Sequence, residues 1–203
     1  MKTSLFSLIA PSATTQIRAD HAHVLSAFHQ FGPYLEPGTK QVIVNTVCRA
    51  LDIHARLEEE LFYPAMRELA PALIDKSVPE HQAMHARIYA LLAIEPTHPE
   101  YDAAVIALMH DVMRHVTDEE TTLLPQAERL LGGRLHEIGA QMVTRRIALV
   151  AARSGEMARD ALSRPGTSIV LAAASASIAA TYLAGDAVTR AFGALSGFQR
   201  RDT

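Results

Sequence analysis

Three pairs of side chains that can bind a metal ion recur along this chain, each with a spacing of four residues. The pairs are His54 and Glu58, His81 and His85, and His115 and Glu119. Residues four apart on a helix project from the same face. Each pair, like the single His21, interrupts a stripe of apolar residues that would face a protein core. Because an unpaired buried carboxylate or imidazolium is costly, these groups need one another or a metal ion.

The seven side chains, five imidazoles and two carboxylates, also indicate the kind of metal. Seven ligands are too many for one zinc ion, and calcium or magnesium sites would not select five imidazoles. The single cysteine, Cys48, excludes a disulfide framework and a cysteine-rich zinc or iron–sulfur site. Two transition-metal ions that share bridging carboxylates fit this set of ligands, and imidazole with carboxylate suits iron.

The ligand set repeats along the chain. The same residue types occur twice at identical offsets, first as His54, Glu58, Glu59 and Pro64, then as His115, Glu119, Glu120 and Pro125. Two dipeptides upstream of these sets also match, Asp20-His21 and Glu80-His81. His85 has no such counterpart, because Leu25 stands at the corresponding position. Two similar pairs of helices would build a bundle with approximate two-fold symmetry.

Composition and periodicity support helices as the elements that position these ligands. The chain has 203 residues, of which 49% are hydrophobic and 20% charged, with a formal net charge of −3. This balance is typical of a globular domain and argues against a disordered chain or a strongly basic nucleic-acid-binding protein. Helical periodicity dominates, and no stretch shows the sustained apolar–polar alternation of a strand. We therefore predict an all-α fold.

Glycine and proline residues divide the predicted helices. We expect helices over about 14–31, 39–69, 79–94, 101–131, 135–162 and 168–195, with Thr14 and Thr15 capping the first. The first four are typical of an up-down four-helix bundle. We assign residues 1–150 to this bundle domain and residues 151–203 to a helical C-terminal extension rich in Ala and Ser.

The ordered ligand motifs resemble those of the hemerythrin family, including the bacterial hemerythrin-like HHE cation-binding domains. The motifs are DH at 20–21, HARLEEELFYP at 54–64, EHQAMH at 80–85 and HVTDEETTLLP at 115–125. The resemblance covers about residues 14–131. It implies a non-haem centre of two iron ions, joined by an oxo or hydroxo bridge, inside a four-helix bundle.

The resemblance also implies how the ligands are divided between the two ions. One iron is expected on His81, His85 and His115, and the other on His21 and His54. Glu58 and a carboxylate of the fourth helix would bridge both irons. Glu119 repeats the spacing of Glu58, whereas the oxygen-carrying hemerythrins place this carboxylate one residue later, at Glu120; the internal repeat favours Glu119. Tyr63 and Met84, which lie close to the ligands in sequence, could line the pocket of the metal site, but we favour apolar packing for both.

The iron with fewer protein ligands would keep an open position for dioxygen, peroxide or nitric oxide. We therefore expect a protein that binds or senses dioxygen or nitric oxide, and favour this over an enzyme. The alternatives are an enzyme that detoxifies peroxide or nitric oxide at the same centre, iron storage, and repair of iron–sulfur centres. The repair relatives carry a cysteine-containing segment near the N-terminus, and no cysteine precedes His21.

The C-terminal segment leaves three alternatives open. No charged residue lies between Arg164 and Asp186, a length that could span a bilayer, but Ala, Ser and Thr dominate the segment. Small residues recur at every fourth position, as in closely packed helix pairs. Residues 168–185 could therefore associate weakly with a membrane, self-associate into a homo-oligomer, or pack on the bundle. We expect a cytoplasmic protein.

Overall fold

The computed structural model describes residues 10–163, and the side chains of residues 10–153. This part of the chain consists of helices and their connections, without a strand. The helices are α2 (Ala13–His29), α3 (Pro37–Leu57), η1 (Glu58–Phe62), α4 (Tyr63–Arg67), α5 (Pro71–Leu92), α6 (Tyr101–Asp118), η2 (Glu119–Leu123), α7 (Leu124–Leu131) and α8 (Arg134–Ser163). The predicted all-α fold is confirmed.

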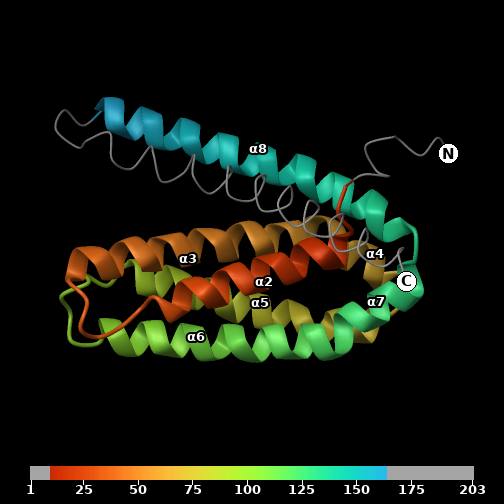
Figure 1. Ribbon diagram of the computed structural model, residues 1–203, viewed down its shortest axis with the longest axis horizontal. Coiled ribbons are helices and arrows are strands. Elements are labelled where there is room, and N and C mark those ends of the chain that lie inside the picture. Colours follow the sequence, from red (N-terminus) through yellow and green to blue (C-terminus); the bar gives the residue numbers. More distant parts are fainter. Residues whose placement is uncertain (1–9, 164–203) are drawn as a thin grey trace, which may run out of the picture. The chain divides into compact units, whose positions relative to one another are not determined.

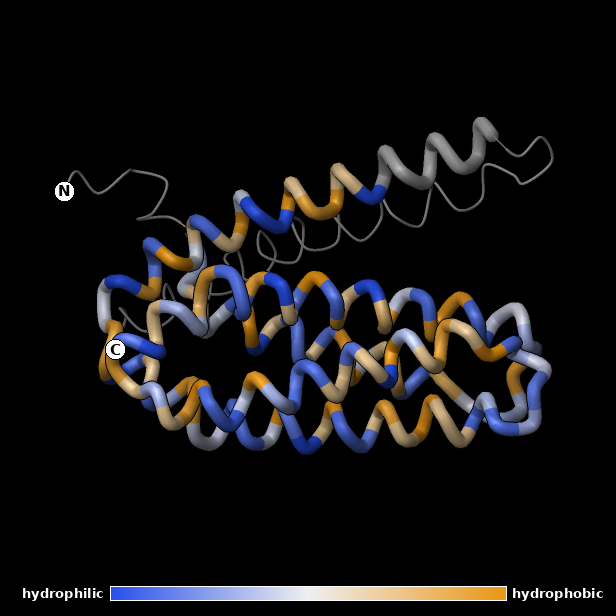
Figure 2. Tube along the Cα trace, turned by 180° about the vertical axis from the view of Figure 1, so that it is seen from behind, coloured by the Kyte–Doolittle hydropathy of each residue, from blue (hydrophilic) through white to orange (hydrophobic). Residues whose placement is uncertain are grey.

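Helices α2, α3, α5 and α6 form a four-helix bundle (Figure 1). Contacts join α2 to α3, α3 to α5, α5 to α6 and α6 back to α2, so the four helices close around one core. Hydrophobic and hydrophilic residues alternate along each helix of the bundle (Figure 2). Their apolar faces meet in a core that includes Val24, Phe28, Val47, Leu51, Met84, Ile88, Leu108 and Val112. The up-down bundle predicted from the periodicity is therefore confirmed, and Met84 packs in its core as expected.

Proline and the N-terminal cap explain where the helices begin. Ser12, rather than Thr14 or Thr15, caps α2, because its hydroxyl accepts a hydrogen bond from the Thr15 N–H at 3.2 Å. The third bundle helix was expected to begin at Pro79. It begins eight residues earlier, at Pro71. In the first turn a proline sacrifices no intrahelical hydrogen bond, so Pro71 fits there. Pro79 lies inside α5, where it has no N–H to donate to the helical hydrogen-bond ladder.

Two bundle helices are interrupted by a π-helical turn at the repeated carboxylate. These turns, η1 and η2, begin at Glu58 and Glu119, and each is closed by a backbone N–H that donates to the carbonyl five residues earlier. In both halves a proline follows the turn. Because proline has no N–H, the regular ladder of hydrogen bonds cannot continue unbroken at this point. Single π-turns are frequent at functional sites.

The first turns of α8 are tied to the start of α2. The Gln16 side-chain amide donates to the carbonyl oxygens of Pro11 and Gly139, at 3.0 and 2.8 Å. A Cβ atom on Gly139 would lie 2.1 Å from the Pro11 carbonyl oxygen, so the approach requires glycine. The chain divides between two compact units at Arg145, and the features described below belong to the first. The assignment of residues 1–150 to one domain stays a prediction.

Within residues 10–163, no helix combines the length and the apolar character needed to cross a membrane. The helix predicted over 168–195 lies outside the described residues. Its membrane association, self-association or packing on the bundle therefore stay predictions.

Candidate metal centre

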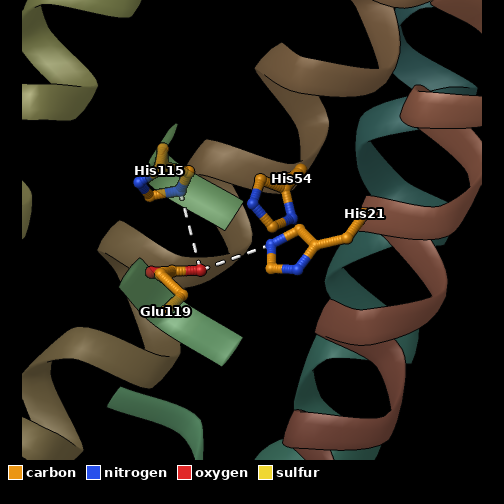
Figure 3. A group of neighbouring side chains, drawn as sticks. All are labelled: His21, His54, His115 and Glu119. Atoms are coloured by element: carbon orange, nitrogen blue, oxygen red, sulfur yellow. Dashed lines mark ion pairs between the residues drawn. The ribbon is translucent and has the colours of Figure 1, made fainter. Parts of the chain in front are cut away.

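Six of the seven predicted ligands meet inside the bundle. His21 comes from α2, His54 from α3, His81 from α5 and His115 from α6, while Glu58 and Glu119 open the two π-turns. All six side chains are buried. Four of them, His21, His54, His115 and Glu119, point toward one another (Figure 3). Four separate helices are thus required to assemble this cluster.

Each carboxylate of the cluster contacts two imidazoles from different helices. The Nε2 atoms of His21 and His115 lie 3.3 and 3.6 Å from Glu119 Oε2. The Nε2 atoms of His54 and His81 both lie 3.3 Å from Glu58 Oε2. The approximate two-fold symmetry of the sequence repeat therefore extends to the contacts of the side chains.

These residues form two overlapping groups of ligand atoms. In each group, one nitrogen or oxygen atom per residue lies within 4.8 Å of all the others. The first group consists of His21, His54, His115 and Glu119, and the second of Glu58, His81, His115 and Glu119. The two groups have His115 and Glu119 in common.

A second carboxylate stands outside each imidazole. The pairs of Nδ1 and carboxylate oxygen are His21 with Glu120 at 3.0 Å, His81 with Glu59 at 3.1 Å, His54 with Asp20 at 3.5 Å, and His115 with Glu80 at 3.6 Å. The first two are hydrogen bonds. Metal-binding histidines commonly donate their other N–H to a carboxylate, which fixes the tautomer and turns the free ring nitrogen toward the metal. Sequence reasoning noticed these four carboxylates as part of the repeat, and Glu120 also as an alternative bridge, but did not assign them this role.

The two candidate bridging residues of the fourth helix occupy different places. The Glu119 side chain is 2% exposed and lies within the cluster. The Glu120 side chain is 39% exposed and accepts a hydrogen bond from the outer nitrogen of His21. The position of Glu119 matches that of Glu58, as the internal repeat indicates.

Burial and mutual contacts shift the pKa values of the clustered groups in opposite directions. Burial and the neighbouring imidazoles lower the pKa of His115 to about 3. Burial and the charge of Glu119 raise the pKa of Glu58. Burial also disfavours the charged forms of His81 and Glu119, but neighbouring carboxylates raise the pKa of His81 to about 10, and the imidazoles of His21 and His115 lower the pKa of Glu119. A metal ion would stabilise both buried carboxylates in their ionised form.

Several inward-facing atoms fit a metal ion as their partner. The atoms are His21 Nε2, His54 Nε2, Glu58 Oε1 and Glu119 Oε2, which are buried and make no hydrogen bond with any residue that the structure describes. Buried polar atoms in proteins nearly always have a hydrogen-bonding partner. A set of imidazole nitrogens and carboxylate oxygens suits a first-row transition metal. The residues present therefore fit the metal implied by the sequence.

His85 is not brought into the cluster. Its side chain is 25% exposed, and its Nε2 atom lies 3.6 Å from Glu59 Oε1. It lines an outer pocket of about 410 Å³ together with Glu59, Tyr63, Pro64, Arg67, Ile74, Val78 and Gln82. Glu59 also accepts from the outer nitrogen of His81. His85 therefore stands beside an outer carboxylate, and its assignment as a ligand has no support in this arrangement.

Tyr63 reaches the cluster instead, so the favoured apolar packing does not hold for its hydroxyl group, and the alternative of lining the site does. The hydroxyl donates to Glu119 Oε1 at 2.8 Å and lies 3.0 Å from His81 Nε2 and 3.3 Å from Glu58 Oε2. Five residues along a regular α-helix, a side chain is turned by about 140° from its starting face. The π-turn after Glu58 removes this offset, so Tyr63 faces the same way as Glu58. The only sign of the π-turn in the sequence is the proline that follows each carboxylate, Pro64 after Glu58 and Pro125 after Glu119.

Three comparisons with known proteins bear on this site. The profile of the Hemerythrin family, described as the hemerythrin HHE cation binding domain, matches residues 12–127. A DNA nickase from Nostoc sp. is 32% identical over 108 residues, which is 53% of this chain and 31% of the nickase. The chain thus spans about a third of the length of that relative.

A similar solved structure is that of a hemerythrin HHE cation binding domain-containing protein from Mycobacterium kansasii. It superimposes with a TM-score of 0.61 at 20% sequence identity, and the match covers 77% of this chain and 95% of the other. At this identity the likeness concerns the fold.

Proposed function

The chain belongs to the hemerythrin HHE cation-binding domain family, and on that premise we propose that its cluster holds two iron ions that bind dioxygen or nitric oxide reversibly. The family and the buried cluster of histidines and glutamates make this a metal-binding domain. The number of ions, their identity and their ligand are our proposals. The observation that carries them is the pair of overlapping ligand groups, which have His115 and Glu119 in common.

The contacts of the carboxylates support one particular division of the ligands. Glu119 contacts His21 and His115, while Glu58 contacts His54 and His81. Suppose that His21 and His54 hold one iron and that His81 and His115 hold the other. Each carboxylate then contacts one histidine of the first iron and one histidine of the second. Glu58 and Glu119 would then be the two bridges.

The composition of the site supports reversible binding of a small ligand. Four imidazoles and two carboxylates are too few to fill the coordination positions of two iron ions, so iron held here would be able to bind dioxygen or nitric oxide. The outer carboxylates would orient the imidazole rings toward the ions. A pocket of about 410 Å³ is lined by Tyr63 and Glu59, both of which contact residues of the cluster, and could admit small molecules.

The test is to load the full chain with iron(II) in the absence of oxygen and to record optical spectra under dioxygen and nitric oxide. We expect a new visible absorption with each gas, and its loss when the gas is removed. Hydrogen peroxide should be consumed no faster than by the same concentration of free iron. Continuous consumption of peroxide or nitric oxide without a reversible spectrum would contradict the proposal and favour the enzyme alternative.

A matched pair of variants on α6 ties these spectra to the cluster. His115→Ala removes a buried imidazole from both ligand groups and is expected to lose at least one iron. His110→Ala changes an exposed histidine of the same helix and should leave metal content and spectra unchanged. Full retention of iron and spectrum by His115→Ala would remove this residue from the site.

A further inference from the structure

The hydroxyl of Tyr63 occupies a place at which a metal ligand is expected. Its oxygen lies 2.8, 3.0 and 3.3 Å from atoms of Glu119, His81 and Glu58. Ligand atoms that bind one ion at about 2.0–2.2 Å, at right angles to each other, lie about 3 Å apart. The phenol oxygen therefore has the spacing of a further member of the same coordination shell.

From this geometry we propose that Tyr63 binds the iron held by His81, through its phenol oxygen and in the position that the sequence had assigned to His85. The inference rests on the proposed iron centre. The Tyr63 side chain is almost fully buried, whereas that of His85 is a quarter exposed and contacts Glu59. Of these two residues, only Tyr63 reaches the inward-facing ligand atoms.

The internal repeat makes this ligand specific to one of the two ions. Tyr63 follows Glu58 by five residues, and the corresponding residue after Glu119 is Leu124. Leu124 is fully buried and has no atom that can bind a metal. The two ions would therefore differ, because the one beside Tyr63 gains an oxygen ligand and the other keeps the open position for a small molecule.

When Tyr63 coordinates the iron, its phenol loses a proton and no electron is transferred. The phenol O–H bond breaks, an oxygen–iron bond forms, and the proton passes to solvent. The product is an anionic oxygen donor, which suits iron(III) better than iron(II). Oxidised protein is therefore the form in which the bond is best observed.

The experiment records visible absorption and resonance Raman spectra of the full chain loaded with iron(III). We expect a phenolate-to-iron charge-transfer band, and ring vibrations that shift when the protein carries ring-deuterated tyrosine. The isotope shift is measured on the unmodified chain, so it does not depend on the folding of any variant.

Three variants locate the band. Tyr63→Phe keeps the aromatic ring and should abolish the band while retaining two irons per chain. His85→Ala, and Tyr34→Phe at a tyrosine that is 85% exposed, should retain both the band and the iron. Two bound irons without a phenolate band, or a band that survives in Tyr63→Phe, would overturn this inference alone. A chain that binds no iron would overturn the proposed function as well.

Discussion

Each imidazole of the cluster is held between a carboxylate on its outer side and a carboxylate on its inner side. The outer residues come from a neighbouring helix in every case: Asp20 reaches His54, Glu80 reaches His115, Glu59 reaches His81 and Glu120 reaches His21. Such partners orient a ligand without touching the metal. Adjacent glutamates, as at 119–120, can therefore have different roles on one helix.

The inner and outer glutamates of the fourth helix should differ in the effect of their removal. We expect Glu119→Ala to lose iron, because it deletes the carboxylate that both ligand groups share. Glu120→Ala should retain two irons but bind them about 10–100-fold more weakly, as is typical when an outer partner of a metal ligand is lost. Metal content after dialysis against a graded chelator measures both effects. The opposite ranking would place Glu120 in the coordination shell.

At the scale of the elements, helical periodicity explains what could be predicted and what could not. The spacing of His54 and Glu58, and of His115 and Glu119, predicted that the members of each pair share a helix face, and both pairs lie in the cluster because regular α-helix extends up to the carboxylate that opens each π-turn. Tyr63 follows a π-turn, where a regular period of 3.6 residues assigns the wrong face. His85 lies outside the cluster for a different reason. The four-residue spacing predicts that His85 shares a helix face with His81. Whether a residue one turn further along α5 also reaches the metal-binding cluster depends on the packing of the neighbouring helices, which the spacing does not give.

The contact between α8 and the start of α2 gives a prediction at this scale. Gly139→Ala would place its methyl group against the Pro11 carbonyl oxygen, so we expect a loss of about 1–3 kcal/mol in the free energy of unfolding. Gly133→Ala is the control, because a Cβ atom there meets nothing within 4 Å. Urea unfolding of the metal-free proteins, followed by circular dichroism, compares the two. Equal stability of the two variants would show that the contact is not made in solution.

For the whole molecule, Cys48 serves as a natural probe of unfolding. It is 2% exposed in the bundle core, and burial raises the pKa of its thiol to about 12. Because its pKa is raised, the Cys48 thiol forms the reactive thiolate only at high pH. At about pH 8, a thiol reagent should therefore label Cys48 only after the protein unfolds. Iron that binds only the folded chain stabilises it, so loading should slow the reaction further. Rapid labelling of the native protein, equal with and without iron, would contradict this packing.

The C-terminal segment should be dispensable for metal binding. All six clustered side chains lie between residues 21 and 119, and the family match ends at residue 127. We expect a chain without residues 165–203 to bind as much iron as the full chain. A smaller oligomer mass of the truncated chain would indicate self-association, and a weaker retention by membranes would indicate anchoring. Loss of iron on truncation would show instead that the segment belongs to the bundle.

The central claim, two iron ions bound by the repeated ligand set, is tested most directly by anomalous diffraction at the iron absorption edge from crystals of the loaded chain. The account predicts two peaks inside the bundle, one beside His21 and His54 and one beside His81, with Glu58 and Glu119 between them. The phenol oxygen of Tyr63 should adjoin the second peak. A single peak, or peaks away from these side chains, would contradict the claim.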